Sequence, residues 1–276
     1  MIFNTHNLSG ELARYVESVF HFKDFIPDHS IERVVPTGHI YLIFELDGIP
    51  RHTYDNETLE PNNTFTRVWV SGMHRQYLSI SAHQDSEMFV IQFKPFGAHP
   101  FFHFSIDEIS DRVLPAEEVL GNPILALRDA LAEESPSETK FKLAENWLIE
   151  RFDENRTPSP ELLEVVERFQ SESVANFSTI VKDYPMTPKH LIHQFKKYVG
   201  ITPKYYQRIL RFNEILQLIH RSEDIEWSQV AYQCEFSDQS HFIKEFRHFS
   251  GFNPQKFIRQ DFHKDEPNFF PLDRKG

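Results

Sequence analysis

A chain of 276 residues is long enough for about two domains. Its 40 % hydrophobic and 25 % charged residues are typical of a globular protein rather than a disordered one. The single cysteine, Cys234, excludes an intramolecular disulfide framework and a multi-cysteine zinc site. The first residues lack the layout of a signal peptide, and no apolar run approaches the roughly 20 residues that cross a bilayer. A cytoplasmic protein without a membrane partner is therefore expected.

The net charge of −12 argues at first against a nucleic-acid partner, but the charge is unevenly distributed. Residues 1–158 contain 13 Lys and Arg against 25 Asp and Glu, whereas residues 159–260 contain 13 against 12. Residues 187–211 contain six basic side chains and no acidic one. The sequence thus predicts a local basic patch on an otherwise acidic protein.

The first part of the chain is predicted to form one helix followed by strands. Residues 11–22 place apolar side chains at helical spacing. Later segments alternate apolar and polar residues and are separated by turns rich in Gly, Pro and Asn. Short strands without intervening helices predict an antiparallel sheet, curled or barrel-like. The predicted strands are residues 39–46, 67–70, 77–82 and 87–93.

Helices complete this N-terminal part, which makes it an α+β domain. Ser105 and Glu108 have the spacing of a capping box for a short helix. Two helices are predicted at 123–134 and 137–152, the first beginning with an Asn-Pro pair. Residues 153–159 are polar and interrupted by proline, which favours a linker. We expect residues 1–152 to form a sensing or dimerisation domain.

Residues 160–260 are predicted to be helical throughout and contain a duplication. Residues 187–209 recur as residues 238–260 at an offset of 51. At that offset Phe195, Gly200 and Pro203 match Phe246, Gly251 and Pro254. Two copies are too few for a solenoid, so a module used twice is the better interpretation. Residues 261–276 form a tail without a clear signal. The predicted helices are residues 160–170, 177–184, 187–199, 203–220, 227–234, 239–250 and 254–259.

Each copy places a short helix, a tight turn and a second helix in succession, which is the layout of a helix-turn-helix DNA reader. Apolar side chains supply a stripe for burial, namely Leu191, Phe195 and Tyr198 in one copy and Phe242, Phe246 and Phe249 in the other. The remaining faces combine amide, hydroxyl, basic and isoleucine side chains, which suit base edges and thymine methyl groups. The candidate DNA-binding residues are Thr187, Lys189, Ile192, His193, Lys196, Lys197, Gln239, Ser240, Ile243, Lys244 and Arg247.

A long helix separates the two copies. Its roughly 17 residues span about 26 Å, while major-groove segments on one face of DNA are about 34 Å apart. Such a spacer suits two recognition helices in successive turns of the groove. Lys204, Arg208 and Arg211 share one face of this helix, where phosphate contact and solubility are equally supported. Whether the first copy reads bases or only phosphates stays open.

The second copy resembles the AraC/XylS family of bacterial transcription regulators through Ala231, Glu235-Phe236, His241-Phe242, Phe246-Arg247, Gly251 and Pro254 at fixed spacing. The resemblance covers about residues 160–260. It implies a fold with two helix-turn-helix units, usually joined to a variable sensing or dimerising domain. Residues 33–36, 42–44, 71–72, 93–98 and 111–113 also resemble an uncharacterised β-rich domain fused ahead of such modules.

The sequence departs from the family pattern at four positions. Glu235 stands where the family usually has glycine, and it costs on the order of 1 kcal/mol if its φ is positive. Pro185 occupies the corresponding turn in the first copy, and Val181 replaces the usual small alanine. His193 stands where arginine is common, which weakens a guanine contact there.

Other side chains offer weaker functional signals. Tyr41, Trp69 and Phe89 are candidate linings of a ligand pocket, with core filling as the alternative. Cys234 is expected to be a buried hydrophobe rather than a nucleophile. No metal site is expected at His99 and His103, because no carboxylate is adjacent. His39, His74 and His83 lie in or near predicted strands. The sequence contains no phosphate loop or nucleophile elbow, so neither an enzyme nor a cofactor is expected.

The sequence thus predicts a DNA-binding transcription regulator that responds to a small molecule through its N-terminal domain. The alternative is an effector- or protein-binding module whose helix-turn-helix units no longer bind DNA specifically. Double-stranded DNA is the expected partner. A small-molecule effector, a second copy in a homodimer and RNA polymerase are further candidates.

Overall fold

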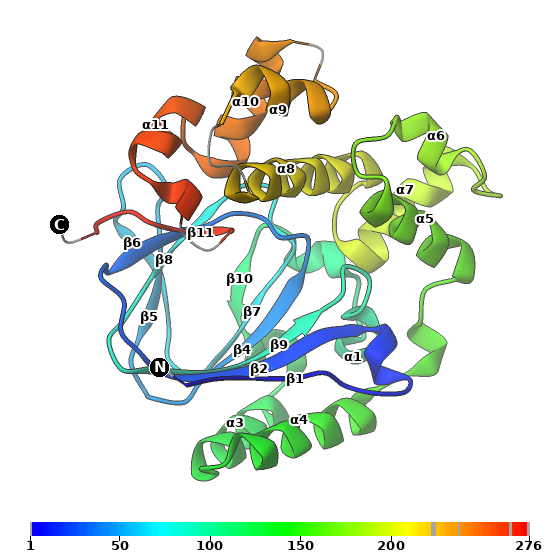
Figure 1. Ribbon diagram of the computed structural model, residues 1–276. Coiled ribbons are helices and arrows are strands. Elements are labelled where there is room, and N and C mark those ends of the chain that lie inside the picture. The colour runs from blue at the N-terminus through cyan, green and yellow to red at the C-terminus, as the bar shows by residue number, and fades with distance from the viewer. Residues whose placement is uncertain (1, 222–224, 237, 265–266, 275–276) are drawn as a thin grey trace.

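The computed structural model describes residues 2–221, 225–236, 238–264 and 267–274 (Figure 1). Two antiparallel sheets lie face to face in the N-terminal part, and the C-terminal helices cover one end of them. The sheets remain separate and do not close into one barrel. This confirms the predicted fold class, an α+β domain with an antiparallel sheet followed by a helical domain.

The first sheet has six strands, and its strands β4 and β7 are buried on both faces. Ile40, Leu42 and Phe44 alternate along the central strand β4 and enter the main core beneath the helices. Tyr41 and Ile43 lie on the other face, which looks toward the second sheet. The strand order is β1 (Ile2–His6), β2 (Val16–Phe25), β9 (Ser86–Phe93), β4 (Ile40–Glu45), β7 (Val68–Ser71) and β10 (Val113–Pro115).

The second sheet has five strands, and one of them comes from the far end of the chain. Phe270 of that strand pairs with Arg33 of its neighbour. The Asp273 carboxylate then accepts hydrogen bonds from the backbone N–H groups of Ser30 and Ile31, at 3.0 and 2.8 Å. The tail therefore completes a sheet of the N-terminal part. The order is β11 (Phe269–Pro271), β3 (Ile31–Val34), β8 (Leu78–Ser81), β5 (Arg51–Tyr54) and β6 (Pro61–Phe65).

The helix predicted over residues 11–22 is wrong, because most of that segment is strand β2. Only Leu12–Arg14 form a helical turn, the 3-10 helix η1. The register of β2 against β9 shifts between Val16 and Ser18, so the strand contains a bulge. Val16 and Val19 consequently both point into the core. Their three-residue spacing imitates one face of a helix.

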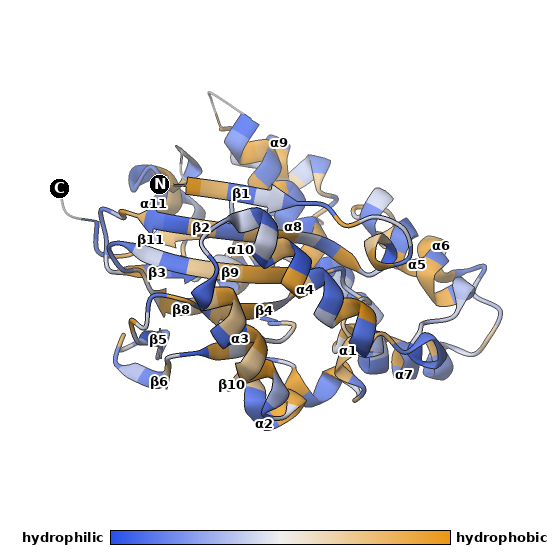
Figure 2. Ribbon diagram, turned by 90° about the horizontal axis from the view of Figure 1, so that it is seen from below, coloured by the Kyte–Doolittle hydropathy of each residue, from blue (hydrophilic) through white to orange (hydrophobic). Residues whose placement is uncertain are grey.

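Helices cover the outer face of the six-stranded sheet, and Figure 2 views them from that side. Lys140 of α4 is buried, and its Nζ lies 3.4 Å from Glu87 of β9. Ser105 precedes a 3-10 helix but makes no capping bond, because its Oγ donates to Asp107 instead. The predicted capping box with Glu108 is therefore wrong. These helices are α1 (His99–Phe102), η2 (Ile106–Ile109), α2 (Ala116–Leu120), α3 (Pro123–Glu133) and α4 (Ser137–Arg151).

The described residues between 160 and 264 form helices joined by turns, in the order that the sequence predicts. The expected linker forms one short turn, η3 (Glu154–Arg156), held to α1 by a hydrogen bond between His99 Nδ1 and the Arg156 carbonyl. Helices α6 and α9 end earlier than predicted. The elements are α5 (Pro160–Ser171), α6 (Phe177–Val181), α7 (Pro188–Val199), α8 (Pro203–Arg221), α9 (Trp227–Gln233), α10 (Gln239–Ser250), α11 (Pro254–Arg259) and η4 (Phe262–Lys264).

One hydrophobic core runs through both parts of the chain. Gly38, after β3, lies against Tyr206 and Leu210 of α8. Asn213 of the same helix donates a hydrogen bond to the Pro36 carbonyl at 3.1 Å. The long helix is therefore seated directly on the sheets, as Figure 1 also shows. None of the helices in the described part of the chain is long and apolar enough to cross a membrane.

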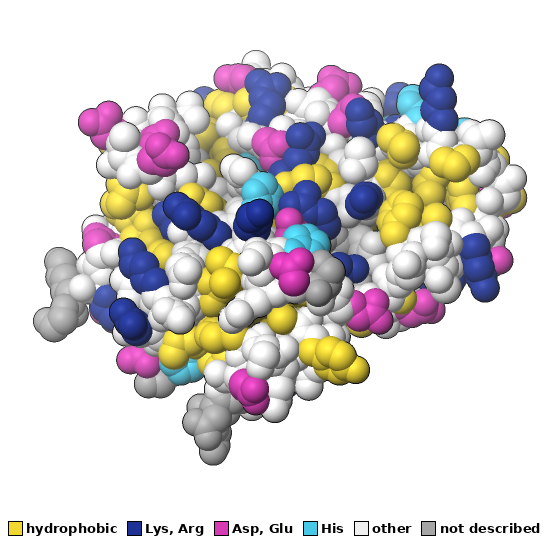
Figure 3. Space-filling model, turned by 90° about the horizontal axis from the view of Figure 1, so that it is seen from above, with side chains coloured by type: hydrophobic (Ala, Val, Ile, Leu, Met, Phe, Trp, Pro, Cys, Tyr) yellow, Lys and Arg dark blue, Asp and Glu magenta, His cyan; other side chains and the backbone are white. Residues whose placement is uncertain are grey.

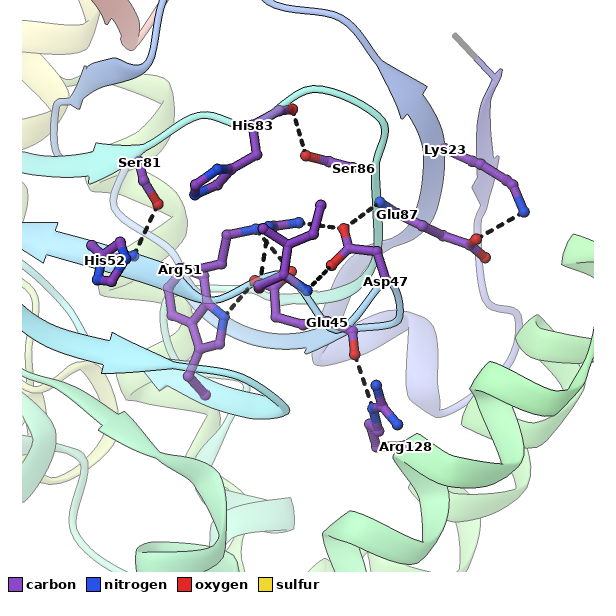
Figure 4. A network of polar contacts seen from close by, with 12 residues as sticks. Lys23, Glu45, Asp47, Arg51, His52, Ser81, His83, Ser86, Glu87 and Arg128 are labelled. Carbon is purple, nitrogen blue, oxygen red and sulfur yellow. Dashed lines mark hydrogen bonds and ion pairs between the residues drawn. The ribbon is translucent and has the colours of Figure 1, made fainter.

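A buried polar network joins the two sheets close to Arg128 of α3 (Figure 4). Glu45, which is fully buried, accepts a hydrogen bond from Trp69 Nε1 at 2.8 Å and pairs with Arg51 Nε at 3.1 Å. Arg51 also pairs with Asp47, so one guanidinium lies against two carboxyl groups. Since Glu45 belongs to the first sheet and Arg51 to the second, the network fixes the distance between them.

Candidate DNA-binding surface

The second helix of the first helix-turn-helix unit, α7, is capped at both ends. Thr187 Oγ1 accepts a hydrogen bond from the backbone N–H of His190 at 3.2 Å, and Pro188 begins the helix. Gly200 ends it with a φ of 92°, and its N–H donates to the carbonyls of Phe195 and Lys196. These caps fix the length and direction of α7.

One face of α7 is buried and the opposite face is free. Leu191, Phe195 and Tyr198 are each at most 5 % exposed, as the sequence predicts. Ile192 is 42 % exposed, although an isoleucine in water contributes nothing to the core. An exposed isoleucine among basic residues is suited to contact with a partner. The exposed residues of this face are Lys189, Ile192, His193 and Lys196.

Two other candidates of this unit have structural contacts as well. The Thr187 hydroxyl is engaged in the cap of α7, although the residue itself is exposed. Lys197 is half-buried, and its ammonium lies 4.8 Å from the centre of the Tyr198 ring. A phosphate contact by either residue would compete with the contact it already makes.

The second unit, α9 and α10, repeats this construction. The Asp238 carboxylate accepts a hydrogen bond from the backbone N–H of His241 at 2.8 Å, and Gly251 ends the helix with a φ of 73°. Phe242, Phe246 and Phe249 are fully buried. Ile243 is half-buried, so it is less accessible than Ile192. The candidates that lie exposed on α10 are Gln239, Ser240, Lys244 and Arg247.

Arg208 of the long helix binds the recognition helix of the second unit. Its Nε and Nη2 each lie 2.8 Å from one carboxylate oxygen of Glu245, so the pair is bidentate. The guanidinium carbon also lies 4.4 Å from the centre of the Tyr205 ring. Sequence reasoning missed this role, because the pairing partner lies 37 residues away in another helix. Arg208 therefore links α10 to α8 through this ion pair.

The turn of the second unit has the strained backbone that the sequence suggested. Glu235 has a φ of 54°, in the region that favours glycine. The adjacent Cys234 is fully buried, as expected for a small hydrophobe. Burial raises the pKa of its thiol to about 12. Cys234 is therefore protonated at neutral pH and unsuited to nucleophilic chemistry.

The three candidate ligand-pocket residues do not converge on one cavity. Tyr41 and Trp69 share the inner face of the six-stranded sheet, where Trp69 stacks on Phe65 of the opposite sheet. Phe89 lies on the other face of that sheet and is fully buried against Phe141 of α4. Alternation along the strands separates the two sets, and every one of these rings fills a core position.

The histidines also serve packing and hydrogen bonding. His103 Nε2 lies 2.9 Å from the Arg151 carbonyl, so both His99 and His103 contact the chain around the linker. His74 Nε2 lies 3.0 Å from Ser71 Oγ. In the portion that the structure describes, no three His, Cys, Asp or Glu side chains are grouped to hold a metal ion.

Basic side chains are spread over the face formed by the C-terminal helices, with histidines and acidic groups among them (Figure 3). The exposed lysines of the two recognition helices are Lys189, Lys196 and Lys244. These basic residues lie on α7 and α10, whereas the excess of acidic residues lies in the N-terminal part. This surface can attract a polyanion despite the net charge of −12.

Two family patterns match this chain. Residues 180–260 match a helix-turn-helix domain. Residues 5–115 match a domain of unknown function (DUF6597). The first match runs from the end of α6 through α11, and the second covers the strands from β2 to β10.

Among curated proteins, the chain is similar to the HTH-type transcriptional activator RhaS. The protein from Enterobacter sp. (strain 638) is 29 % identical over 118 residues, which are 43 % of this chain and 41 % of that protein. The one from Pectobacterium carotovorum is 30 % identical over 105 residues, 38 % of this chain and 37 % of that protein. Both relatives are named as transcriptional activators. The aligned segments span less than half of their length.

Among solved structures, the chain is similar to ToxT from Vibrio cholerae. One ToxT structure matches with a TM-score of 0.46 and 12 % identity over 93 % of this chain and 98 % of ToxT. Wild-type ToxT bound to an unsaturated fatty acid matches with a TM-score of 0.44 and 12 % identity over 93 % of this chain and 94 % of ToxT.

Proposed function

Because its two helix-turn-helix units place this chain in the AraC/XylS family of transcription regulators, we propose that it binds specific DNA sequences and regulates transcription. Residues 160–260 bind double-stranded DNA in this proposal. Residues 1–152 receive a small-molecule signal, form a dimer, or do both, with 153–159 as linker and 261–276 as tail. The observation that carries the proposal is the pair of capped helices, α7 and α10, each with a buried aromatic face and a polar, basic outer face.

The outer side chains divide by the chemistry of the contacts they suit. Gln239 and Ser240, at the start of α10, offer an amide and a hydroxyl to base edges, and Lys244 suits the acceptors of guanine. On α7, Lys189 and Lys196 suit phosphates, while Ile192 suits a thymine methyl group. The two faces differ, so the two units are expected to bind different half-sites.

The spacing of the units agrees with DNA geometry. Helix α8 has 19 residues and is therefore about 28 Å long. Successive major-groove segments on one face of the duplex are about 34 Å apart. Since α7 and α10 pack near opposite ends of α8 (Figure 1), one chain can address two adjacent turns of the groove. A homodimer and a contact with RNA polymerase belong to the same proposal.

A second candidate function is a protein-binding module. It is favoured by three large apolar side chains exposed on the helix-turn-helix units, Met186 at 39 %, Ile192 at 42 % and Tyr232 at 83 %. In this alternative these residues meet a protein partner, and the units no longer bind DNA specifically.

A mobility-shift experiment with genomic fragments across a salt series separates the two functions. The regulator is expected to bind selected fragments tightly, with an affinity that falls steeply as salt rises. Lys244→Ala should weaken specific binding by about 1–3 kcal/mol. Lys142→Ala, which removes an exposed lysine of α4, is the matched control and should bind as the wild type does. Salt-insensitive binding, or no binding to any fragment, would refute the regulator and favour the protein-binding module.

A further inference from the structure

A cleft with a volume of about 560 Å³ opens between the two sheets at the end nearest α8. The β5–β6 hairpin supplies one wall through Thr53 and Asn63, and the β7–β8 loop supplies another through residues 74–77. Asp111, shortly before β10, and Tyr205 of α8 complete it. Its volume lies within the roughly 300–1,000 Å³ of typical small-molecule sites. The cleft is therefore built jointly by the sheets and the DNA-binding part.

The charges lining this cleft are already compensated. Asp111 accepts a hydrogen bond from the backbone N–H of Arg75 at 2.7 Å, and its other oxygen lies 3.4 Å from Arg75 Nε. Burial lowers the pKa of His74 to about 4, so its imidazole is neutral at pH 7. A charged ligand would find no unpaired opposite charge among the described residues of the wall. Because Arg75 and Asp111 balance each other, the wall gives a charged ligand no net charge to attract it.

The remaining lining is rich in groups that both donate and accept hydrogen bonds. Asn56 is held rigidly, because its side chain donates to the Tyr77 carbonyl and accepts from Ser79 Oγ, both at 2.9 Å. The Asn63 side chain, in contrast, makes one long contact among the described residues, in which its amide lies 3.4 Å from Thr53 Oγ1. Its amide can exchange that contact for a ligand group. Tyrosine rings add apolar faces beside these amides.

From this lining we infer that the cleft binds a small uncharged molecule rich in hydroxyl or amide groups. Ligand binding in the cleft is independent of the proposed function. Only the effect of the ligand on DNA affinity rests on that function. The site differs from the pocket expected from the sequence, because Tyr41, Trp69 and Phe89 do not line it.

Residues that line the cleft also hold α10, the recognition helix of the second unit, in place. The Tyr205 hydroxyl donates to the Arg75 carbonyl at 3.2 Å and accepts a hydrogen bond from His248 of α10. Gln76 Nε2 lies 3.4 Å from the other ring nitrogen of His248. A ligand that contacts Tyr205 or residues 74–77 therefore acts on the residues that hold α10. Occupancy of the cleft is coupled to the position of α10.

Behind the same loop, Tyr77 contacts the end of α10. A Cβ atom added to Gly251 would approach the Tyr77 ring to 2.7 Å, so the two surfaces are in close contact. Arg33 lies over the Tyr77 ring, 4.1 Å from its centre, and donates a hydrogen bond to the Ser250 carbonyl at 3.3 Å. The loop thus has the cleft on one side and the helix terminus on the other.

Calorimetric titration of the full chain tests the site without DNA. The probes are monosaccharides and nucleosides, each beside its phosphorylated counterpart. We expect neutral members to bind and Asn63→Asp to weaken that binding about tenfold, because it loses a donor and adds a charge. Asn122→Asp is the matched control, because it adds the same charge at an exposed residue that does not line the cleft. Binding by no neutral probe, or tighter binding of the phosphates, would overturn the inference.

The coupling needs a second measurement, DNA affinity with and without the neutral probe that binds. His248→Ala should retain calorimetric binding, because His248 does not line the cleft, but lose the effect of the probe on DNA affinity. An unchanged effect in that variant would refute the coupling. If no DNA is bound at all, the proposed function fails while the calorimetry still decides the site.

Discussion

Glu235 holds a backbone conformation that favours glycine, and this strain is local to the second turn. Its φ of 54° follows Cys234 at the end of α9. The resemblance to the AraC/XylS family identified this position, but only the structure shows that the left-handed conformation is kept despite the side chain. The fold of the second unit therefore tolerates a stored cost of about 1 kcal/mol.

Glu235→Gly is expected to raise the free energy of unfolding by up to about 1 kcal/mol, since glycine adopts a positive φ without steric cost. Urea denaturation followed by circular dichroism measures the difference. Glu172→Gly is the control, because Glu172 has a φ of −126° and gains nothing from glycine. A loss of stability in Glu235→Gly would show that the side chain makes a favourable contact that outweighs the strain.

Glu45 should make stability depend on pH. Burial raises the pKa of its carboxyl from 4.5 to about 7, although Arg51 and Trp69 oppose that rise. Between these values the folded chain holds the proton more tightly than the unfolded chain does. The contribution of Glu45 to stability is therefore greatest below pH 4.5 and falls as pH rises towards 7, by an amount on the order of 3 kcal/mol.

Glu45→Gln removes this titration, so its stability should vary less between pH 4.5 and 7 than that of the wild type. Urea denaturation at several pH values in that window provides the measurement. Glu138→Gln, on the exposed side of α4, should keep the wild-type profile. Identical profiles for Glu45→Gln and the wild type would mean that Glu45 stays ionised beside Arg51.

At the scale of elements, the long helix α8 does more than separate the two units. Arg208 fastens α10 to it through the bidentate pair with Glu245. The sequence left a phosphate contact and a solubilising role equally open for Arg208. Because both carboxylate oxygens are engaged at 2.8 Å, the structure favours an internal role.

Arg208→Gln should leave the slope of DNA affinity against salt concentration unchanged, because a residue paired to Glu245 releases no counterion from phosphate. A phosphate contact would lower that slope by about one. Filter binding across a salt series measures it, with Lys196→Gln as a positive control for a phosphate contact. Because the Arg208 side chain is partly exposed, its ion pair with Glu245 contributes about 1 kcal/mol or less to the free energy of unfolding.

The elements also show how far the sequence predicts this fold. Helices α3 to α11 follow from apolar periodicity, and the start of α3 also follows from its Asn-Pro pair, because those signals are local. Strand β2 was mistaken for a helix, since its bulge places Val16 and Val19 on one face. Strand β11 carries no local signal, because pairing with a strand more than 230 residues earlier stabilises it.

The same contrast applies to the sites. The burial of Phe195 and Phe246 and the exposure of Lys196 and Lys244 follow from helical spacing, and the structure agrees. The cleft was not predictable, because Asn63, Asp111 and Tyr205 come from segments that no sequence pattern brings together. Tyr41 and Phe89 were grouped by residue type alone, whereas strand alternation places them on opposite faces.

At the scale of the whole molecule, the tail ties the DNA-binding helices to the sheets. Phe270 of β11 is 1 % exposed, and its ring lies 4.9 Å from that of Phe257 in α11. The same residue pairs with Arg33 in the five-stranded sheet. The Phe270 side chain therefore packs against α11, while its backbone belongs to the five-stranded sheet.

Phe270→Ala is expected to lower the free energy of unfolding by roughly 3–5 kcal/mol, because a large aromatic side chain leaves a cavity. Phe269→Ala is the matched control on the same strand. Phe269 is 39 % exposed, so its loss should cost much less. Thermal denaturation of both full-length variants makes the comparison. Equal effects of the two substitutions would show that the tail adds little to the core.

The position of strand β11 also bears on how the chain is made. A ribosome synthesises residues 31–34 more than 230 residues before residues 269–271, so β3 lacks this neighbour until the later segment has emerged. During that interval β3 presents an unpaired edge, which favours pairing with other chains. A product that stops before residue 269 keeps that edge open permanently. Copies that stop before residue 269 should therefore aggregate or be degraded, whereas chains that include β11 stay folded.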